Sequence, residues 1–114
     1  MATYTEEITL SDVVVGDRWV GISSITATIN GSTPGLALDR VRLSFRLGQS
    51  VYTLDSDEAE ITIDADAWTA SVPAQDTFLN RAGLWSWNME FWPTGYASPF
   101  TLYSGTLRVW DDVD

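Results

Sequence analysis

The chain has 114 residues, 45% of them hydrophobic and 12% aromatic, which excludes a disordered segment and suffices for one folded domain over 1–114. Its six basic residues are all arginine and are outnumbered by 16 acidic ones, so the net charge of −10 argues against nucleic-acid and membrane partners. Cysteine and histidine are both absent, which removes disulfides, thiolate catalysis, structural zinc and the commonest general base.

The N-terminal stretch lacks the features of a targeting sequence. MATYTEEITL is acidic, whereas a signal peptide begins with a positive region followed by an apolar one. The sequence has no apolar run of about 18 residues, so no transmembrane helix is predicted. We expect a domain without cofactors that folds in a cytoplasm.

The first part of the chain is expected to hold extended segments. Thr3–Leu10 is predicted as an exposed or edge strand, and Val13–Gly16 as a short edge segment. Arg18–Asn30 is long and β-branched, and its apolar parity switches near Ser23–Ser24, which predicts a β-bulge. This pattern points Val20 inward.

The middle of the chain has the clearest period-two alternation. In Asp39–Gly48, apolar residues alternate with arginine and serine, which predicts a half-buried strand. Its inward residues are Val41, Leu43, Phe45 and Leu47. Val51–Leu54 is predicted as the hairpin partner, followed by a solvated acidic loop at Asp55–Glu60. Two further strands are expected at Ile61–Ile63 and Ala67–Pro73.

The stretch Gln75–Trp92 is expected to organise the core. After a helical turn at Asp76–Ala82, a strand turns one apolar face inward and one polar face outward. The inward residues are Trp85, Trp87, Met89 and Phe91, and the outward residues are Ser86, Asn88 and Glu90. Pro93–Pro99 is predicted as a hairpin loop, and Phe100–Trp110 as the final strand, broken at Gly105.

The spacing of these segments indicates the fold class. Turn signals recur about every 8–12 residues, and no long helical periodicity occurs. The sequence therefore predicts an immunoglobulin-like antiparallel β-sandwich of about seven to nine strands.

Four segments carry a resemblance to a known group of proteins. They are Gly16–Asp17, the strand VRLSFRL at Val41–Leu47, DTFLNRAGLW at Asp76–Trp85, and LYSGTLRVWDDV at Leu102–Val113. In this order they resemble small structural proteins of tailed bacteriophages, including the N-terminal domain of baseplate upper proteins. The resemblance implies a non-enzymatic virion part of the tail, baseplate or fibre-attachment region. Such a part docks on other phage structural proteins in several copies, as a homo-oligomer or symmetric ring.

Aromatic residues outside the core pattern are the first interface candidates. Trp92 has the opposite parity to Trp85, and Tyr96 lies in a predicted loop. Exposed aromatics are enriched at protein interfaces, so the candidates are Trp92, Tyr96, Phe100 and Trp110. The alternative is that these rings plug an edge or end of the sandwich.

The arginines of the predicted 39–48 strand are the second candidates. Arg42 and Arg46 lie on its outward face, with Arg40 beside them. A basic stripe on an acidic protein suits docking on an acidic surface, including that of another copy. Cross-strand pairing with a neighbouring carboxylate is the slightly preferred alternative.

The acidic region offers two further interpretations. Six carboxylates lie between Asp55 and Asp66, and oxygen ligands suit calcium, but the EF-hand pattern with its glycine is missing. Asp64 and Asp66 could suggest a glycosidase pair, yet nothing in the sequence buries either of them. Solvated turns explain both features, and we expect no enzymatic activity.

Two other functions fit the same fold. A carbohydrate- or host-receptor-binding module would stack loop aromatics on sugar rings and needs coplanar exposed rings on one face. A capsid decoration protein is similar in size and also oligomeric. An assembly module instead predicts apolar patches on two different surfaces, one for each neighbour.

Overall fold

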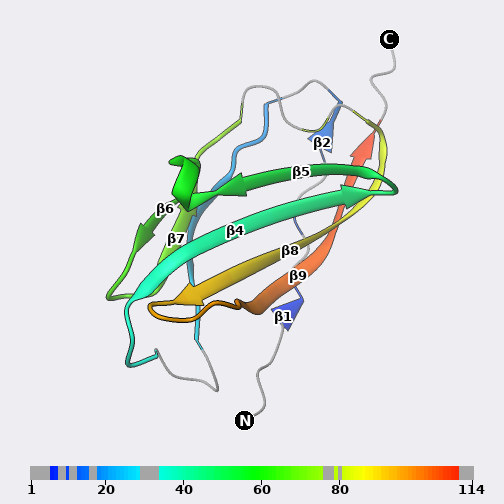
Figure 1. Cartoon of the computed structure of the whole chain (residues 1–114). Helices are drawn as coiled ribbons and strands as arrows, with labels where there is room; N and C mark the ends of the chain where they lie inside the picture. The colour runs from blue at the N-terminus through cyan, green and yellow to red at the C-terminus, as the bar shows by residue number, and fades with distance from the viewer. Residues whose placement is uncertain are drawn as a thin grey trace.

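Two β-sheets packed face to face make up the described part of the chain (Figure 1). The computed structural model describes residues 6–7, 10, 13–15, 18–28, 34–75, 79 and 81–110. The strands are β1 Glu6–Glu7, β2 Val13–Val14, β3 Ile22–Thr26, β4 Leu38–Leu47, β5 Ser50–Asp55, β6 Thr62–Asp64, β7 Thr69–Val72, β8 Gly83–Pro93 and β9 Phe100–Trp110. Within these described residues, one 3-10 turn, η1, spans Ser56–Glu58. The prediction of an all-β fold in two sheets is confirmed.

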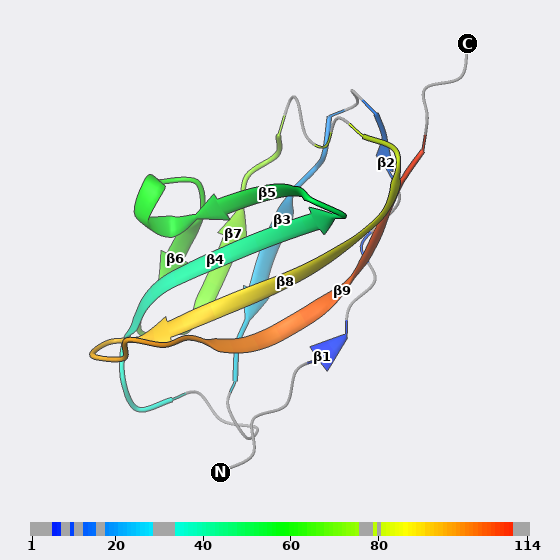
Figure 2. The same ribbon diagram turned by 45° about the vertical axis from the view of Figure 1, so that its right-hand side comes forward.

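The larger sheet has the order β1-β9-β8-β4-β5, with β2 also paired to β9, and the smaller sheet has the order β3-β7-β6. Figures 1 and 2 show the smaller sheet lying behind the larger one. The prediction of a purely antiparallel sandwich is wrong, because β1 and β2 both run parallel to β9. Strands joined by a hairpin must run antiparallel. Because β1 and β2 are far from β9 in the sequence and no hairpin joins them to it, they can pair with it in the parallel direction.

The core forms where β4 and β8 lie side by side in antiparallel register. Val41 pairs with Phe91, Leu43 with Met89, and Phe45 with Trp87. All six side chains are buried, as the alternation predicted. Rings from elsewhere complete this cluster, because Trp68 stacks on Phe91 at 6.3 Å and Trp19 meets Phe45 edge-on at 5.8 Å.

The segment before β3 departs from the predicted parity. Trp19 is buried and forms a bridge with Gln75, whereas Val20 is 81% exposed. The cause is Gly21, whose φ of +80° turns the backbone out of the extended conformation that alternation assumes. The bulge predicted at Ser23–Ser24 is confirmed, because the register with β7 shifts between Ile22 and Ile25.

Two other local predictions need correction. β9 is continuous through Gly105, and its irregularity lies instead opposite Met89 and Glu90 of β8. The described residues of the helical turn expected at Asp76–Ala82 (79, 81 and 82) are not helical, and its other residues lie outside the described part. Most of the strand expected at Thr3–Leu10 also lies outside it. The part of the chain that the structure describes contains no helix long and apolar enough to cross a membrane.

Candidate functional site

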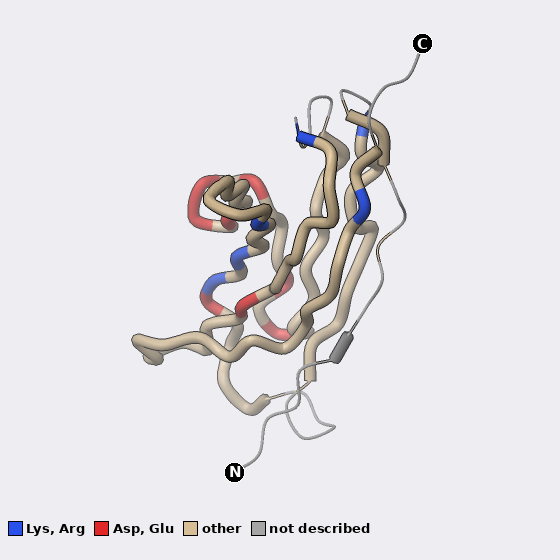
Figure 3. The backbone as a smooth tube through the Cα atoms, turned by 90° about the vertical axis from the view of Figure 1, so that its right-hand side faces the viewer, with Lys and Arg blue, Asp and Glu red and all other residues tan. Residues whose placement is uncertain are grey.

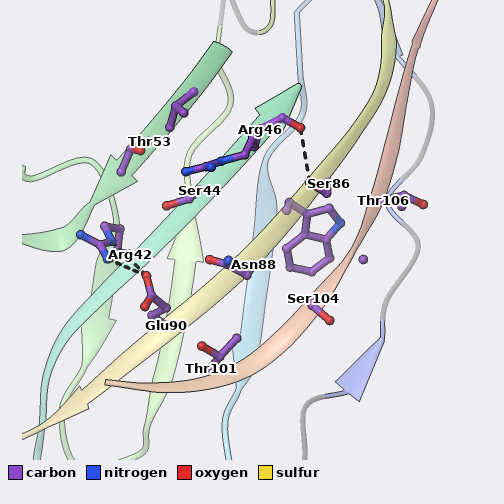
Figure 4. Close-up of a pocket in the computed structure, with 13 residues that line it drawn as sticks. Arg42, Ser44, Arg46, Thr53, Ser86, Asn88, Glu90, Thr101, Ser104 and Thr106 are labelled. Atoms are coloured by element: carbon purple, nitrogen blue, oxygen red, sulfur yellow. Dashed lines mark hydrogen bonds and ion pairs between the residues drawn. The ribbon is translucent and has the colours of Figure 1, made fainter. Parts of the chain in front are cut away.

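The outer face of the larger sheet, turned away from the smaller sheet, is lined by polar side chains. Its central row crosses four strands, because Ser44 of β4 lies opposite Thr53 of β5 and Asn88 of β8, and Asn88 lies opposite Ser104 of β9. This row belongs to an open hollow of about 760 Å³, which Figure 4 shows in close-up. Its short hydroxyl and amide groups can donate and accept hydrogen bonds, and they present no nucleophile paired with a base.

Arg42 flanks this row and is paired within the sheet. Its Nη2 lies 2.7 Å and its Nε 3.1 Å from Oε1 of Glu90, the residue opposite it on β8 (Figure 4). The preferred interpretation of Arg42, cross-strand pairing with a carboxylate, is confirmed.

Arg40 forms an ion pair with Asp55, a residue that the sequence pattern predicts in a solvated loop. Asp55 is only 7% exposed and accepts a hydrogen bond of 3.0 Å from Nε of Arg40. It also caps η1, because its Oδ1 accepts the backbone N–H of Asp57 at 3.0 Å. The hydrogen bond from Arg40 lowers the pKa of Asp55, although partial burial opposes it. The prediction of full solvation is therefore wrong for Asp55, because its partner lies 15 residues away on β4.

Trp92, an interface candidate, is covered by these same arginines. The guanidinium carbons of Arg40 and Arg42 lie 4.6 and 5.2 Å from the centre of its ring. This cation–π arrangement leaves Trp92 only 9% exposed, so the expectation of an exposed ring is wrong at this position.

Arg46 lies at the other end of β4 and differs from Arg40 and Arg42. It lines the hollow, its side chain is exposed, and Ser86 donates a hydrogen bond of 3.4 Å to its backbone carbonyl (Figure 4). In the part of the chain that the structure describes, neither Arg46 nor Arg108 of β9 makes an ion pair. Both guanidinium groups therefore keep their charge available to a partner.

Exposed apolar side chains surround these two cations. Val51 lies opposite Arg46, and Leu84 lies opposite Arg108. The guanidinium carbon of Arg108 lies 5.2 Å from the ring centre of Trp110. Val51, Leu84 and Trp110 are each at least half exposed. We call Arg46, Val51, Leu84, Arg108 and Trp110 the arginine patch.

A second exposed apolar group lies at the opposite end of the sheet. The β8–β9 hairpin projects from the sandwich (Figures 1 and 2) and carries Tyr96, whose ring centre lies 5.8 Å from that of Phe100. Tyr96 is 49% exposed and Phe100 is half-buried. Thr94 at the base of the hairpin donates its N–H to Ala37 at 2.9 Å, next to exposed Leu36. We call Leu36, Tyr96 and Phe100 the hairpin patch.

The acidic candidates do not come together as a site. Oδ1 of Asp64 accepts the backbone N–H groups of Asp66 and Ala67 at 3.2 and 3.1 Å, so it closes a turn. Asp64 and Asp66 are both exposed, so neither carboxyl group lies in the buried apolar pocket that the acid of a glycosidase needs. Within the described ranges, no three acidic residues are placed to hold a metal ion.

No protein-family model and no curated protein matches this sequence.

Proposed function

We propose that this chain is a non-enzymatic structural protein of a tailed-phage virion. In this proposal it is an immunoglobulin-like module of the tail, baseplate or fibre-attachment region that acts by docking on other virion proteins. The sequence motifs suggest the class of protein. The observation that carries the docking role is the presence of two separate apolar patches.

The hairpin patch and the arginine patch lie at opposite ends of the larger sheet. On β8, Leu84 and Pro93 are separated by nine residues, which corresponds to roughly 30 Å of extended strand. The hairpin continues beyond Pro93 to Tyr96, so the two patches are too far apart for one compact partner contact. A module held between two neighbours needs two such surfaces.

The composition of both patches suits protein contacts. Tyrosine, tryptophan and arginine are the residues most enriched at energetically important interface positions. Each patch includes one large exposed aromatic ring, Tyr96 or Trp110, and at least one exposed aliphatic side chain. Isolated apolar residues are ordinary on a protein surface, whereas such groupings mark interaction sites.

The same geometry does not favour an aromatic sugar platform. The rings of Tyr96 and Phe100 are tilted by 48°, so they are not coplanar. Trp110 lies at the far end of the sheet, and Trp92 is covered by Arg40 and Arg42. A glycan would have to rely on the polar hollow, without stacking.

The proposal is tested by complementation of a phage that lacks this gene. Particles made with the wild-type chain are expected to contain it after gradient purification, and Tyr96→Ser is expected to reduce its incorporation several-fold. Val20→Ser, which alters an exposed valine outside both patches, is the matched control and should be incorporated normally. Normal incorporation of Tyr96→Ser contradicts the role of the hairpin patch, and absence of the wild-type chain from particles contradicts the proposed function.

A further inference from the structure

We infer that the arginine patch binds an acidic surface of a second copy of this chain. The inference rests on the proposed function, in that it names one partner of an assembly module. It assigns the arginine patch to self-association and leaves the hairpin patch for a different neighbour.

The charge of this patch differs from that of the molecule as a whole. The chain carries a net charge of −10, yet the outer face at this end presents Arg46 and Arg108, neither of them ion-paired in the described residues. By contrast, Arg40 and Arg42 on the same face have carboxylate partners. The described residues of the patch thus present two arginines beside apolar side chains on an acidic molecule, which suits an acidic partner.

The chain itself offers an acidic surface of this kind. Four exposed carboxylates form what we call the acidic corner: Asp57, Glu58, Asp64 and Asp66. Two hydrogen bonds connect this corner to the start of β4. The side-chain hydroxyl of Ser56 in η1 accepts the N–H of Val41 at 2.9 Å, and the backbone carbonyl of Ala65 accepts the N–H of Leu38 at 2.9 Å. Figure 3 shows acidic positions gathered around η1.

The arginine patch and the acidic corner of one molecule lie far apart. Arg46 follows Val41 by five residues and Leu38 by eight along β4, or roughly 16 and 26 Å of strand. Direct ion pairing needs about 4 Å, and charges farther apart than about 8 Å are largely screened at physiological salt. The arginine patch and the acidic corner of one molecule therefore cannot neutralise each other. They can do so only between molecules.

The contact is head to tail, because it joins two different surfaces. Such a heterologous contact leaves one unused patch and one unused corner at the ends of every dimer. When further copies add through the same contact, the assembly closes into a ring or grows as a filament, depending on the rotation between neighbouring copies. A ring is the form that a symmetric tail can accept.

The test is a charge-reversal experiment read out as solution mass by light scattering. Wild-type protein is expected to associate with increasing concentration, and to dissociate when NaCl is raised from about 0.05 M to about 0.5 M. Arg46→Glu with Arg108→Glu is expected to weaken association more than about tenfold, and so is Glu58→Arg with Asp64→Arg. A mixture of these two double variants should associate again, since each patch then meets a corner of opposite charge.

A matched control separates specific contacts from net charge. Arg46→Ala with Arg108→Ala lowers the net charge by two, and so does Ser23→Glu with Thr26→Glu on exposed positions of β3. Only the arginine variant is expected to lose association. A wild-type chain that stays monomeric at every salt concentration overturns the inference, and so does a mixture that fails to associate. Incorporation into particles is measured separately from self-association. A chain that is incorporated but does not self-associate overturns this inference and leaves the virion role intact. A chain that self-associates but is absent from particles refutes only the virion role.

Discussion

Trp87 and Trp85 provide a matched pair for testing how this core is stabilised. They are neighbours on the inward face of β8, and they are 3% and 2% exposed. Nε1 of Trp85 donates to the carbonyl of Arg81 at 2.9 Å. Nε1 of Trp87 is buried and has no hydrogen-bond partner among the residues that the structure describes. We predict that Trp87→Phe destabilises the fold much less than Trp85→Phe.

The magnitude follows from the two N–H groups. Both substitutions remove the same part of an indole ring from a buried site, so their cavity costs are similar. Trp87→Phe also removes an unsatisfied donor, a burden of about 1–3 kcal/mol, whereas Trp85→Phe loses a hydrogen bond worth about 0.5–1.5 kcal/mol. The free energies of unfolding of the two variants should therefore differ by about 1.5–4.5 kcal/mol, with Trp87→Phe the more stable.

The assay is equilibrium urea unfolding followed by circular dichroism, which avoids the change in tryptophan fluorescence. With slopes of about 1–3 kcal/mol/M, the predicted difference separates the two midpoints by about 0.5 M or more. If Trp87→Phe unfolds at the same urea concentration as Trp85→Phe, or at a lower one, the reasoning is refuted.

Two further predictions concern Asp55 and Gly21. Since the hydrogen bond from Arg40 lowers the pKa of Asp55 in the folded state, its stabilisation is present above the unfolded pKa of about 4 and is lost as pH falls through the folded value. Asp55→Asn should therefore lower the free energy of unfolding by about 1.5–3 kcal/mol at pH 7. The free energy of unfolding of this variant should also fall less steeply than that of the wild type as the pH is lowered below about 4. An equally steep fall in the variant speaks against this account. Gly21→Ala should cost about 3 kcal/mol or more, because φ is +80° and the new Cβ would lie 2.2 Å from the carbonyl oxygen of Val72. Thermal unfolding checks this against Gly35→Ala, which meets nothing within 4 Å and should unfold near the wild-type temperature.

The sequence was sufficient where one local pattern determines the environment of a residue. Strict alternation in β4 and β8 correctly assigned Leu43, Phe45 and Met89 to the core, because successive side chains of a strand point alternately to the buried and the solvent-facing side of the sheet. The parity switch at Ser23–Ser24 likewise revealed a bulge.

The wrong predictions concern side chains whose exposure is determined by non-local contacts or by the conformation of one neighbouring residue. Asp55 was expected in solvent, but an arginine 15 residues away pairs with it. Trp92 was expected to be exposed, but cross-strand register brings two guanidinium groups over its ring. Val20 was expected inside, but the positive φ of Gly21 reverses the direction of its side chain.

The arginine patch was only partly visible in the sequence. Arg46 and Trp110 were among the interface candidates, whereas Leu84 and Arg108 were not. The pairing of β8 with β9 places Leu84 opposite Arg108, and no periodicity within one strand predicts that pairing. An unpaired charge becomes evident only after the pairs of the other arginines are known.

The central claim, that this chain is a docking component of a virion, is tested most directly by quantitative mass spectrometry of gradient-purified particles. The account predicts a fixed copy number per particle, in proportion to the tail proteins and unchanged by a high-salt wash of the intact particle. A chain that is abundant in infected cells but absent from purified particles would contradict it.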